Sequence, residues 1–195
     1  MYLFFDTETN GLPINWKAPV TLLNNWPRLV QIAWQQIDKH SQLLRAEEFI
    51  IKPDGFVISK EATGIHGITT ERAMREGFDL KTVMLEFASV IDRSDILVAH
   101  NMDFDEKIVG AEFIRTAVPH QMMNRQRICT MKASTDICRL PGPYGYKWPT
   151  LTELVQFLFQ TDFEEAHQAG TDVAACVRCF FELKKRGVFL DEKKA

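Results

Sequence analysis

Two acidic side chains lie two residues apart, directly after a short apolar run near the N-terminus. Residues 2–5 are apolar and largely aromatic, which predicts a buried β-strand. Asp6 and Glu8 follow this run, and residues two apart on an extended strand point to the same side. Neighbouring carboxylates repel each other unless a cation lies between them or one takes a proton. The pair therefore fits an oxygen-ligand site for Mg²⁺ or Mn²⁺, and it equally fits a strand end that is simply solvated.

Two further segments carry acidic residues at the expected starts of helices. Asp105 follows a short apolar run at residues 96–99, and Asp172 lies near the start of the last expected helix. A carboxylate in the first turn of a helix is stabilised by the helix N-terminus, so Asp105 taken alone also fits a structural role. His167 precedes Asp172 by five residues, a spacing that can bring a loop residue and a helix residue to one site.

Strand and helix patterns alternate in a way that would place Asp6, Glu8 and Asp105 at the same edge of a sheet. Three strands in close succession favour an antiparallel meander at the start of the chain. Residues 13–27 contain three prolines and are expected to form a loop. The expected strands span 2–5, 28–37, 46–52, 96–99 and 127–130, and the expected helical segments span 59–67, 80–91, 103–116, 148–159 and 170–186. This order predicts an α/β sandwich around a mixed sheet, with strands 2–5 and 96–99 as central neighbours.

Size and composition are those of one globular domain. The chain has 195 residues, of which 46% are hydrophobic and 25% charged. We expect a single domain over residues 1–190 and a short charged tail over 191–195. No apolar run approaches the roughly 18 residues of a membrane span, and the chain starts with a strand rather than a signal peptide. A cytoplasmic location is therefore expected.

The cysteines form no disulfide framework. There are four, and Cys176 and Cys179 have a spacing that can bind zinc. A second pair at matching spacing is missing, since Cys129 and Cys138 are too far apart. Cys176 and Cys179 also fall inside a helical pattern, so they are interpreted as buried helical residues.

The net charge of −3 argues against a broad basic surface for nucleic acid. A protein that works on a strand end through metal ions does not need such a surface.

Taken together, the motifs resemble those of the DnaQ-like (DEDDh) 3′-5′ exonucleases, the family of the proofreading subunit of bacterial replicative DNA polymerases. The resemblance spans most of the chain, and its motifs occur in the order of the family. They are Phe5-Asp6-Thr7-Glu8-Thr9-Asn10-Gly11-Leu12, Glu61-Ala62-x-Gly64-x-His66-Gly67-Ile68-Thr69, His100-Asn101-x-x-Phe104-Asp105 and His167-x4-Asp172. The family implies a ribonuclease H-like fold, a mixed five-stranded sheet flanked by helices, which agrees with the predicted order of elements.

The resemblance also implies a mechanism, in which two divalent ions, Mg²⁺ or Mn²⁺, promote phosphodiester hydrolysis. Asp6, Glu8 and Asp172 would hold one ion, and Asp6 would bridge to a second ion that Asp105 also reaches. His167 would be the general base, for which it must be neutral.

Substrate contacts follow from the same resemblance. Thr9 and Leu12 would seat the 3′-terminal nucleotide, with Leu12 as a wedge between the last two bases. Glu61 and His66 match positions that contact this nucleotide, and Phe104 would pack against it.

The implied activity is removal of mononucleotides from a single-stranded or frayed 3′ end of DNA, with a DNA polymerase as a candidate partner. The same chemistry on RNA or short oligoribonucleotides stays open, because the carboxylates do not distinguish the two sugars. An inactive nucleic-acid-binding or polymerase-associated module is the alternative from another class. All five expected catalytic positions are filled, which argues against that alternative. Asn10 departs mildly from the threonine often found there, and the 13–27 loop is longer than in minimal members.

Overall fold

The fold was analysed in a computed structural model that describes residues 1–163 and 168–189. His167 and the expected tail at 191–195 lie outside the described residues. Within the described part, no helix is both long enough and apolar enough to span a membrane.

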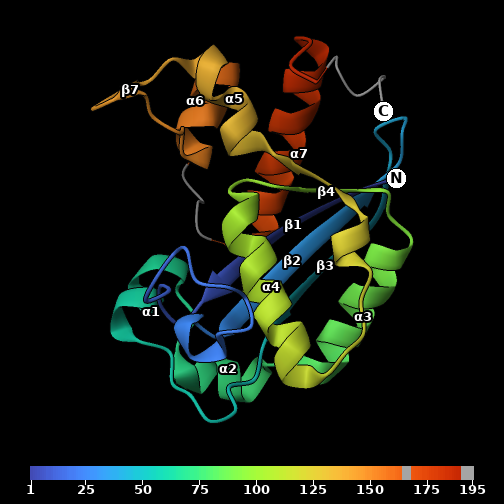
Figure 1. The fold of residues 1–195 in the computed structure, drawn as a ribbon, viewed down its shortest axis with the longest axis vertical. Coiled ribbons are helices and arrows are strands. Elements are labelled where there is room, and N and C mark those ends of the chain that lie inside the picture. The colour runs from blue at the N-terminus through green and yellow to red at the C-terminus, as the bar shows by residue number, and fades with distance from the viewer. Residues whose placement is uncertain (164–167, 190–195) are drawn as a thin grey trace.

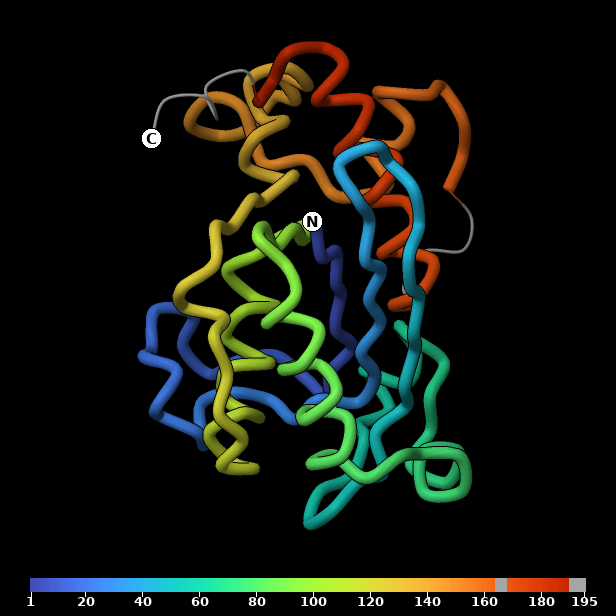
Figure 2. Tube along the Cα trace, turned by 90° about the vertical axis from the view of Figure 1, so that its right-hand side faces the viewer, coloured from blue at the N-terminus to red at the C-terminus, as the bar shows by residue number. Residues whose placement is uncertain are grey.

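A mixed five-stranded sheet forms the centre of the molecule, with strand order β3-β2-β1-β4-β5 (Figure 1). β2 pairs antiparallel with both β1 and β3, and Figure 2 shows β2 and β3 as a long hairpin. β1 pairs parallel with β4, which pairs parallel with β5. The strands span Tyr2–Thr9 (β1), Leu29–Ile37 (β2), Leu43–Ile50 (β3), Ile96–Ala99 (β4) and Gln126–Cys129 (β5). This is the ribonuclease H-like arrangement that the sequence predicts, with β1 and β4 as central neighbours.

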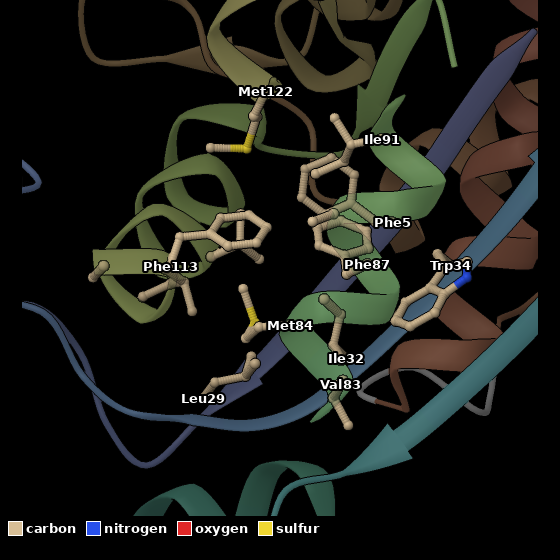
Figure 3. Packing of buried hydrophobic residues seen from close by; sticks show 14 of the residues in the cluster. Phe5, Leu29, Ile32, Trp34, Val83, Met84, Phe87, Ile91, Phe113 and Met122 are labelled. Atoms are coloured by element: carbon tan, nitrogen blue, oxygen red, sulfur yellow. The ribbon is translucent and has the colours of Figure 1, made fainter. Parts of the chain in front are cut away.

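One face of the sheet packs against α3 (Leu80–Asp92) and α4 (Met102–Thr116). Figure 3 shows the centre of this packing, where Phe5 of β1 and Phe87 of α3 lie in ring contact with centroids 5.4 Å apart. Asp79 is the N-cap of α3, because its side chain accepts a hydrogen bond from the Thr82 N–H.

The opposite face packs against α7 (Ala169–Lys185). Phe4 of β1 meets Phe180 of α7 with ring centroids 5.2 Å apart. Cys176 and Cys179 are both buried free thiols on α7, which confirms their interpretation as helical core residues. Even-numbered residues of β1 thus face α7, and odd-numbered residues face α3 and α4.

The remaining helices cover the ends of this sandwich. α1 (Lys60–His66) and α2 (Thr70–Glu76) follow β3, while α5 (Thr130–Cys138) and α6 (Leu151–Phe159) pack beside α7. Thr150 caps α6 in a capping box with Glu153. A two-stranded hairpin, β6 (Pro141–Gly142) and β7 (Gly145–Tyr146), connects α5 to α6.

Most of the predicted elements are confirmed, with shifted ends. β1 continues through Thr9 instead of ending at residue 5, because its backbone keeps pairing with β2 as far as Leu29. The 13–27 loop is irregular, as predicted, except for a short 3-10 helix at Leu23–Asn25. Of its two tryptophans, Trp26 is buried in the core, whereas Trp16 is 53% exposed and lies against Phe104.

Candidate active site

Asp6, Glu8 and Asp172 meet on the α7 face of the sheet. Asp6 and Glu8 extend from β1 on the same side as Phe4, and Asp172 lies in the first turn of α7. One carboxylate oxygen from each of the three residues lies within 4.8 Å of the other two. Residues separated by more than 160 positions thus come together, because β1 and the start of α7 meet at this point.

Asp105 reaches the same site from the other face. It lies in the first turn of α4 and is only 2% exposed. Thr7, between the two acidic residues of β1, donates to Asp105 Oδ1 through its backbone N–H at 3.1 Å and its hydroxyl at 2.7 Å. Sequence reasoning assigned no role to Thr7, although its odd-numbered place on β1 is the signal that it faces α4.

Burial and mutual repulsion raise the pKa values of Asp6, Glu8 and Asp105. Burial first, then the charges of Asp105, Asp172 and Glu8, hold the pKa of Asp6 well above its usual range. Burial and Asp172 raise the pKa of Glu8 to about 7. Burial also raises the pKa of Asp105 to about 8, although the two hydrogen bonds from Thr7 oppose this shift. The cluster is therefore costly to ionise without a counter-charge.

An open pocket of about 460 Å³ lies over the cluster. The four carboxylates form one part of its wall, and Phe104 of α4 forms another. Met131, Trp148 and Leu151 add apolar surface from the α5–α6 region. Acidic groups beside aromatic surface suit a ligand that combines a phosphate, reached through cations, with a planar ring.

His100 directly follows β4 and is hydrogen-bonded to Pro149, which lines this pocket. Its Nε2 lies 3.0 Å from the carbonyl oxygen of Pro149, and its Nδ1 lies 3.0 Å from the hydroxyl of Thr130. A carbonyl only accepts, so Nε2 carries the proton and the Thr130 hydroxyl donates to Nδ1. Burial lowers the pKa of His100 to about 4, despite the opposing bond to Pro149.

The predicted substrate residues divide into two groups. Phe104 lines the pocket beside the carboxylates. The other four predicted residues do not line this pocket and come later in the chain than Glu8; they are Thr9, Leu12, Glu61 and His66.

His66 is nevertheless tied to that end of β1. Its Nδ1 accepts the Ile68 N–H at 3.1 Å, so its Nε2 faces the Thr9 carbonyl at 3.3 Å as a donor. Leu12 is 74% exposed just past Thr9, and Glu61 is exposed in the first turn of α1.

The four carboxylates fit a divalent metal. Their ligand set is entirely oxygen, which suits Mg²⁺ or Mn²⁺, and three of them already converge. A bound cation would lower the raised pKa values of Asp6, Glu8 and Asp105, because a nearby positive charge stabilises the ionised form.

Comparison with known proteins identifies a family and relatives that cover most of this chain. A protein-family model described as "Exonuclease" (RNase_T) matches residues 3–180. The PolC-type DNA polymerase III of Streptococcus suis is 32% identical over 92% of this chain, which covers 11% of that polymerase. The corresponding polymerase of Streptococcus mutans is 29% identical over 99% of this chain, again 11% of the relative. The chain thus spans about a tenth of the length of these curated relatives.

Solved structures of similar fold come from Escherichia coli exonuclease I. A zinc-bound complex with single-stranded DNA matches with a TM-score of 0.75 and 21% identity, over 96% of this chain and 42% of the other. A complex with a dT13 oligonucleotide matches with a TM-score of 0.75 and 20% identity, over 97% of this chain and 42% of the other. At this level of identity, the likeness shows the fold.

Proposed function

This chain belongs to the exonuclease family of DnaQ-like enzymes, and on that premise we propose that it hydrolyses phosphodiester bonds at 3′ ends of DNA and releases nucleoside 5′-monophosphates. The observation that supports this most directly is the convergence of Asp6, Glu8 and Asp172 within 4.8 Å beneath an open pocket. The matched exonuclease I structures hold single-stranded DNA, which supports a single-stranded or frayed 3′ end as the substrate.

We assign the carboxylates to metal binding. Asp6, Glu8 and Asp172 are the proposed ligands of one divalent cation, and Asp6 and Asp105 are the proposed ligands of a second. Bound there, such cations supply Lewis-acid stabilisation of the charge that develops on the phosphate oxygens. Thr7 fixes the orientation of Asp105 through its two hydrogen bonds, so that this carboxylate is in place before substrate binds.

His167 is the proposed general base, on the strength of its place in the sequence two residues before α7. A neutral imidazole there would accept a proton from the attacking water. A free imidazole has a pKa of about 6.5, so the rate should increase as pH rises through this range and the imidazole loses its proton. Full activity and an unchanged pH profile in His167→Ala would show that another group acts as the base.

Thr9, Leu12, Glu61, His66 and Phe104 are the proposed contacts of the 3′-terminal nucleotide. Phe104 lines the pocket, and Leu12 is exposed three residues after Thr9, as a wedge between bases requires. Leu12→Ala should therefore weaken binding of single-stranded DNA, and wild-type binding and rate in this variant would exclude the wedge.

The decisive experiment compares Asp105→Asn with Asp103→Asn. Asp105 is buried in the site, whereas Asp103 is exposed two residues earlier on the same helix and pairs with Lys132. On 5′-labelled single-stranded DNA with Mg²⁺ or Mn²⁺, the wild-type protein and Asp103→Asn should give a ladder that shortens from the 3′ end. Asp105→Asn and a chelator should each abolish it. If the wild-type protein cleaves under none of these conditions, the proposed function is wrong.

An RNA oligonucleotide of the same sequence is tested in parallel. The ratio of the hydrolysis rates of DNA and RNA then decides which of them is the preferred substrate. A polymerase partner is proposed on the description of the curated relatives, and co-purification with a PolC-type polymerase tests it.

A further inference from the structure

A short hairpin stands beside the catalytic pocket without joining the main sheet. β6 and β7 pair only with each other in the described structure, and Figure 1 shows β7 projecting at the edge of the molecule. The chain runs from the hairpin directly into Trp148 and Pro149, which line the pocket over the carboxylates. The hairpin is therefore a surface feature continuous with the wall of the site.

Three aromatic side chains are exposed along this segment at alternate positions. Tyr144 at the tip is fully exposed, Tyr146 is 52% exposed and Trp148 is 59% exposed. Tyr146 and Trp148 lie two residues apart on the segment that leads into the pocket, a spacing that favours the same side of an extended chain, and Tyr144 adds a third ring from the turn of the hairpin. Single exposed aromatic residues are common, but three within five residues next to a catalytic pocket point to a ligand with several planar rings.

The charge of the segment differs from that of the whole chain. Residues 139–148 contain Arg139 and Lys147 and no acidic residue, whereas the full chain has a net charge of −3. Lys132 adds a third cation, with its ammonium 6.0 Å from the centre of the Trp148 ring. Lys132 and Lys147 each pair with a carboxylate, and Arg139 is exposed with its guanidinium bonded to a backbone carbonyl. Cations between aromatic rings are the composition that binds single-stranded nucleic acid.

We propose that Tyr144, Tyr146 and Trp148 form a stacking surface for the bases of a single strand, on the side of the substrate that leads away from its 3′-terminal nucleotide. This assignment rests on the proposed exonuclease function, because the strand must enter the pocket for the row to continue it. The carboxylate cluster would attract phosphates only through bound cations. The hairpin supplies affinity for the strand that does not depend on those cations.

The test compares two double variants of the full chain. Tyr144→Ala/Tyr146→Ala removes both rings outside the pocket, and Tyr144→Phe/Tyr146→Phe keeps them. Both residues are exposed, so thermal unfolding should not change in either variant. The first probe is a 5′-fluorescent dT12 oligonucleotide, with binding followed by anisotropy in Ca²⁺. The alanine variant should bind about tenfold or more weakly, and the phenylalanine variant like the wild type.

A second oligonucleotide separates stacking from charge. It has the length and phosphates of dT12 but abasic sites at all positions except the last two at the 3′ end. Wild-type protein should bind it as weakly as the alanine variant binds dT12, and the alanine substitutions should cost little further affinity. A full tenfold loss on the abasic strand would overturn the stacking assignment, as would unchanged binding of dT12 by the alanine variant.

Hydrolysis of thymidine 5′-monophosphate p-nitrophenyl ester separates this inference from the proposed function. The ester reports on the catalytic centre but has no strand to stack, so both double variants should hydrolyse it at the wild-type rate. No hydrolysis by the wild-type protein would count against the proposed function, while the anisotropy measurement would still test the hairpin. A loss of ester hydrolysis in the alanine variant equal to its loss on dT12 would overturn the hairpin's role as a separate binding surface.

Discussion

Thr7 links the two acidic segments of the site through a single side chain. Its hydroxyl and N–H both donate to the same oxygen of Asp105, so the carboxylate on α4 is oriented by the strand that carries Asp6 and Glu8. Hydrogen bonds to an ionised acceptor are about twice as strong as neutral ones. We therefore propose that Thr7, between two proposed metal ligands, is a positioning residue.

Replacement of Thr7 by valine tests this role with almost no change in shape. Thr7→Val keeps the N–H bond but removes the hydroxyl donor, which should lower kcat about tenfold, equivalent to about 1.4 kcal/mol. The KM for a single-stranded oligonucleotide should change little, because Asp105 acts on the reacting phosphate rather than on the bases. Thr7→Ser restores the hydroxyl and should recover most of the rate. Equal rates for the valine and serine variants would show that the hydroxyl is not needed.

At the scale of elements, the start of α7 is held against the sheet by two polar side chains. Gln31 of β2 accepts the Ala169 N–H at 3.3 Å and donates to Glu48 of β3 at 2.5 Å. Gly170 makes this approach possible, because a Cβ there would lie 2.5 Å from a carboxylate oxygen of Glu48. The same first turn carries Asp172, so the position of this ligand depends on contacts with β2 and β3.

Gly170→Ala should therefore displace the Glu48 carboxylate from Gln31, the residue that holds the start of α7, and lower activity. We expect kcat to fall about tenfold, because small misplacements of catalytic groups have large effects on rate. Glu48→Ala in the same chain removes the clashing oxygen, so the double variant should regain much of the activity that Gly170→Ala loses. The single variant Glu48→Ala completes the double-mutant cycle. Additive losses in the double variant would contradict a steric cause.

The order of elements could be predicted because hydrophobic periodicity reports it directly, as in α3 with its Asp79 cap. α2 and α5 were not predicted. α2 has only seven residues, and α5 begins straight from β5 without a side-chain cap. The meeting of Asp6, Glu8 and Asp172 follows from strand spacing and family motifs. Contacts such as Thr7 with Asp105 need the tertiary packing of α4, which no local pattern records.

For the molecule as a whole, the catalytic site lowers stability when no cation is bound. The folded-state pKa values of Glu8 and Asp105 are raised to about 7 and about 8, above their unfolded values. The folded protein therefore binds more protons than the unfolded chain from about pH 4 to pH 8, and the stability gained at low pH is lost as pH rises through this range. His100 acts in the opposite direction, since its pKa of about 4 is lowered. Its stabilising effect is present above about pH 6.5 and is lost as pH falls toward 4.

In one pH range, only the carboxylates of this set make the free energy of unfolding depend on pH. Between about pH 6.5 and pH 8, His100 is neutral in both states, so only the carboxylates change protonation on unfolding within this set of groups. With a chelator present, we expect the free energy of unfolding to fall by roughly 2 kcal/mol across this window. Urea titrations at several pH values measure it. Glu8→Gln and Asp105→Asn should each flatten the slope, and Asp103→Asn should not.

Divalent cations should reverse this pH dependence. Metal ligands must be deprotonated, so Mg²⁺ or Mn²⁺ binds more tightly as the carboxylates lose their protons. A cation that binds only the folded state stabilises it in proportion to the logarithm of its concentration above the Kd. The increase in melting temperature on adding Mn²⁺ should therefore be larger at pH 8 than at pH 6. It should be small in Asp105→Asn and close to that of the wild type in Asp103→Asn. An equal increase in all three proteins would place the cation elsewhere, and the fall in stability with pH would then have no connection to metal binding at this site.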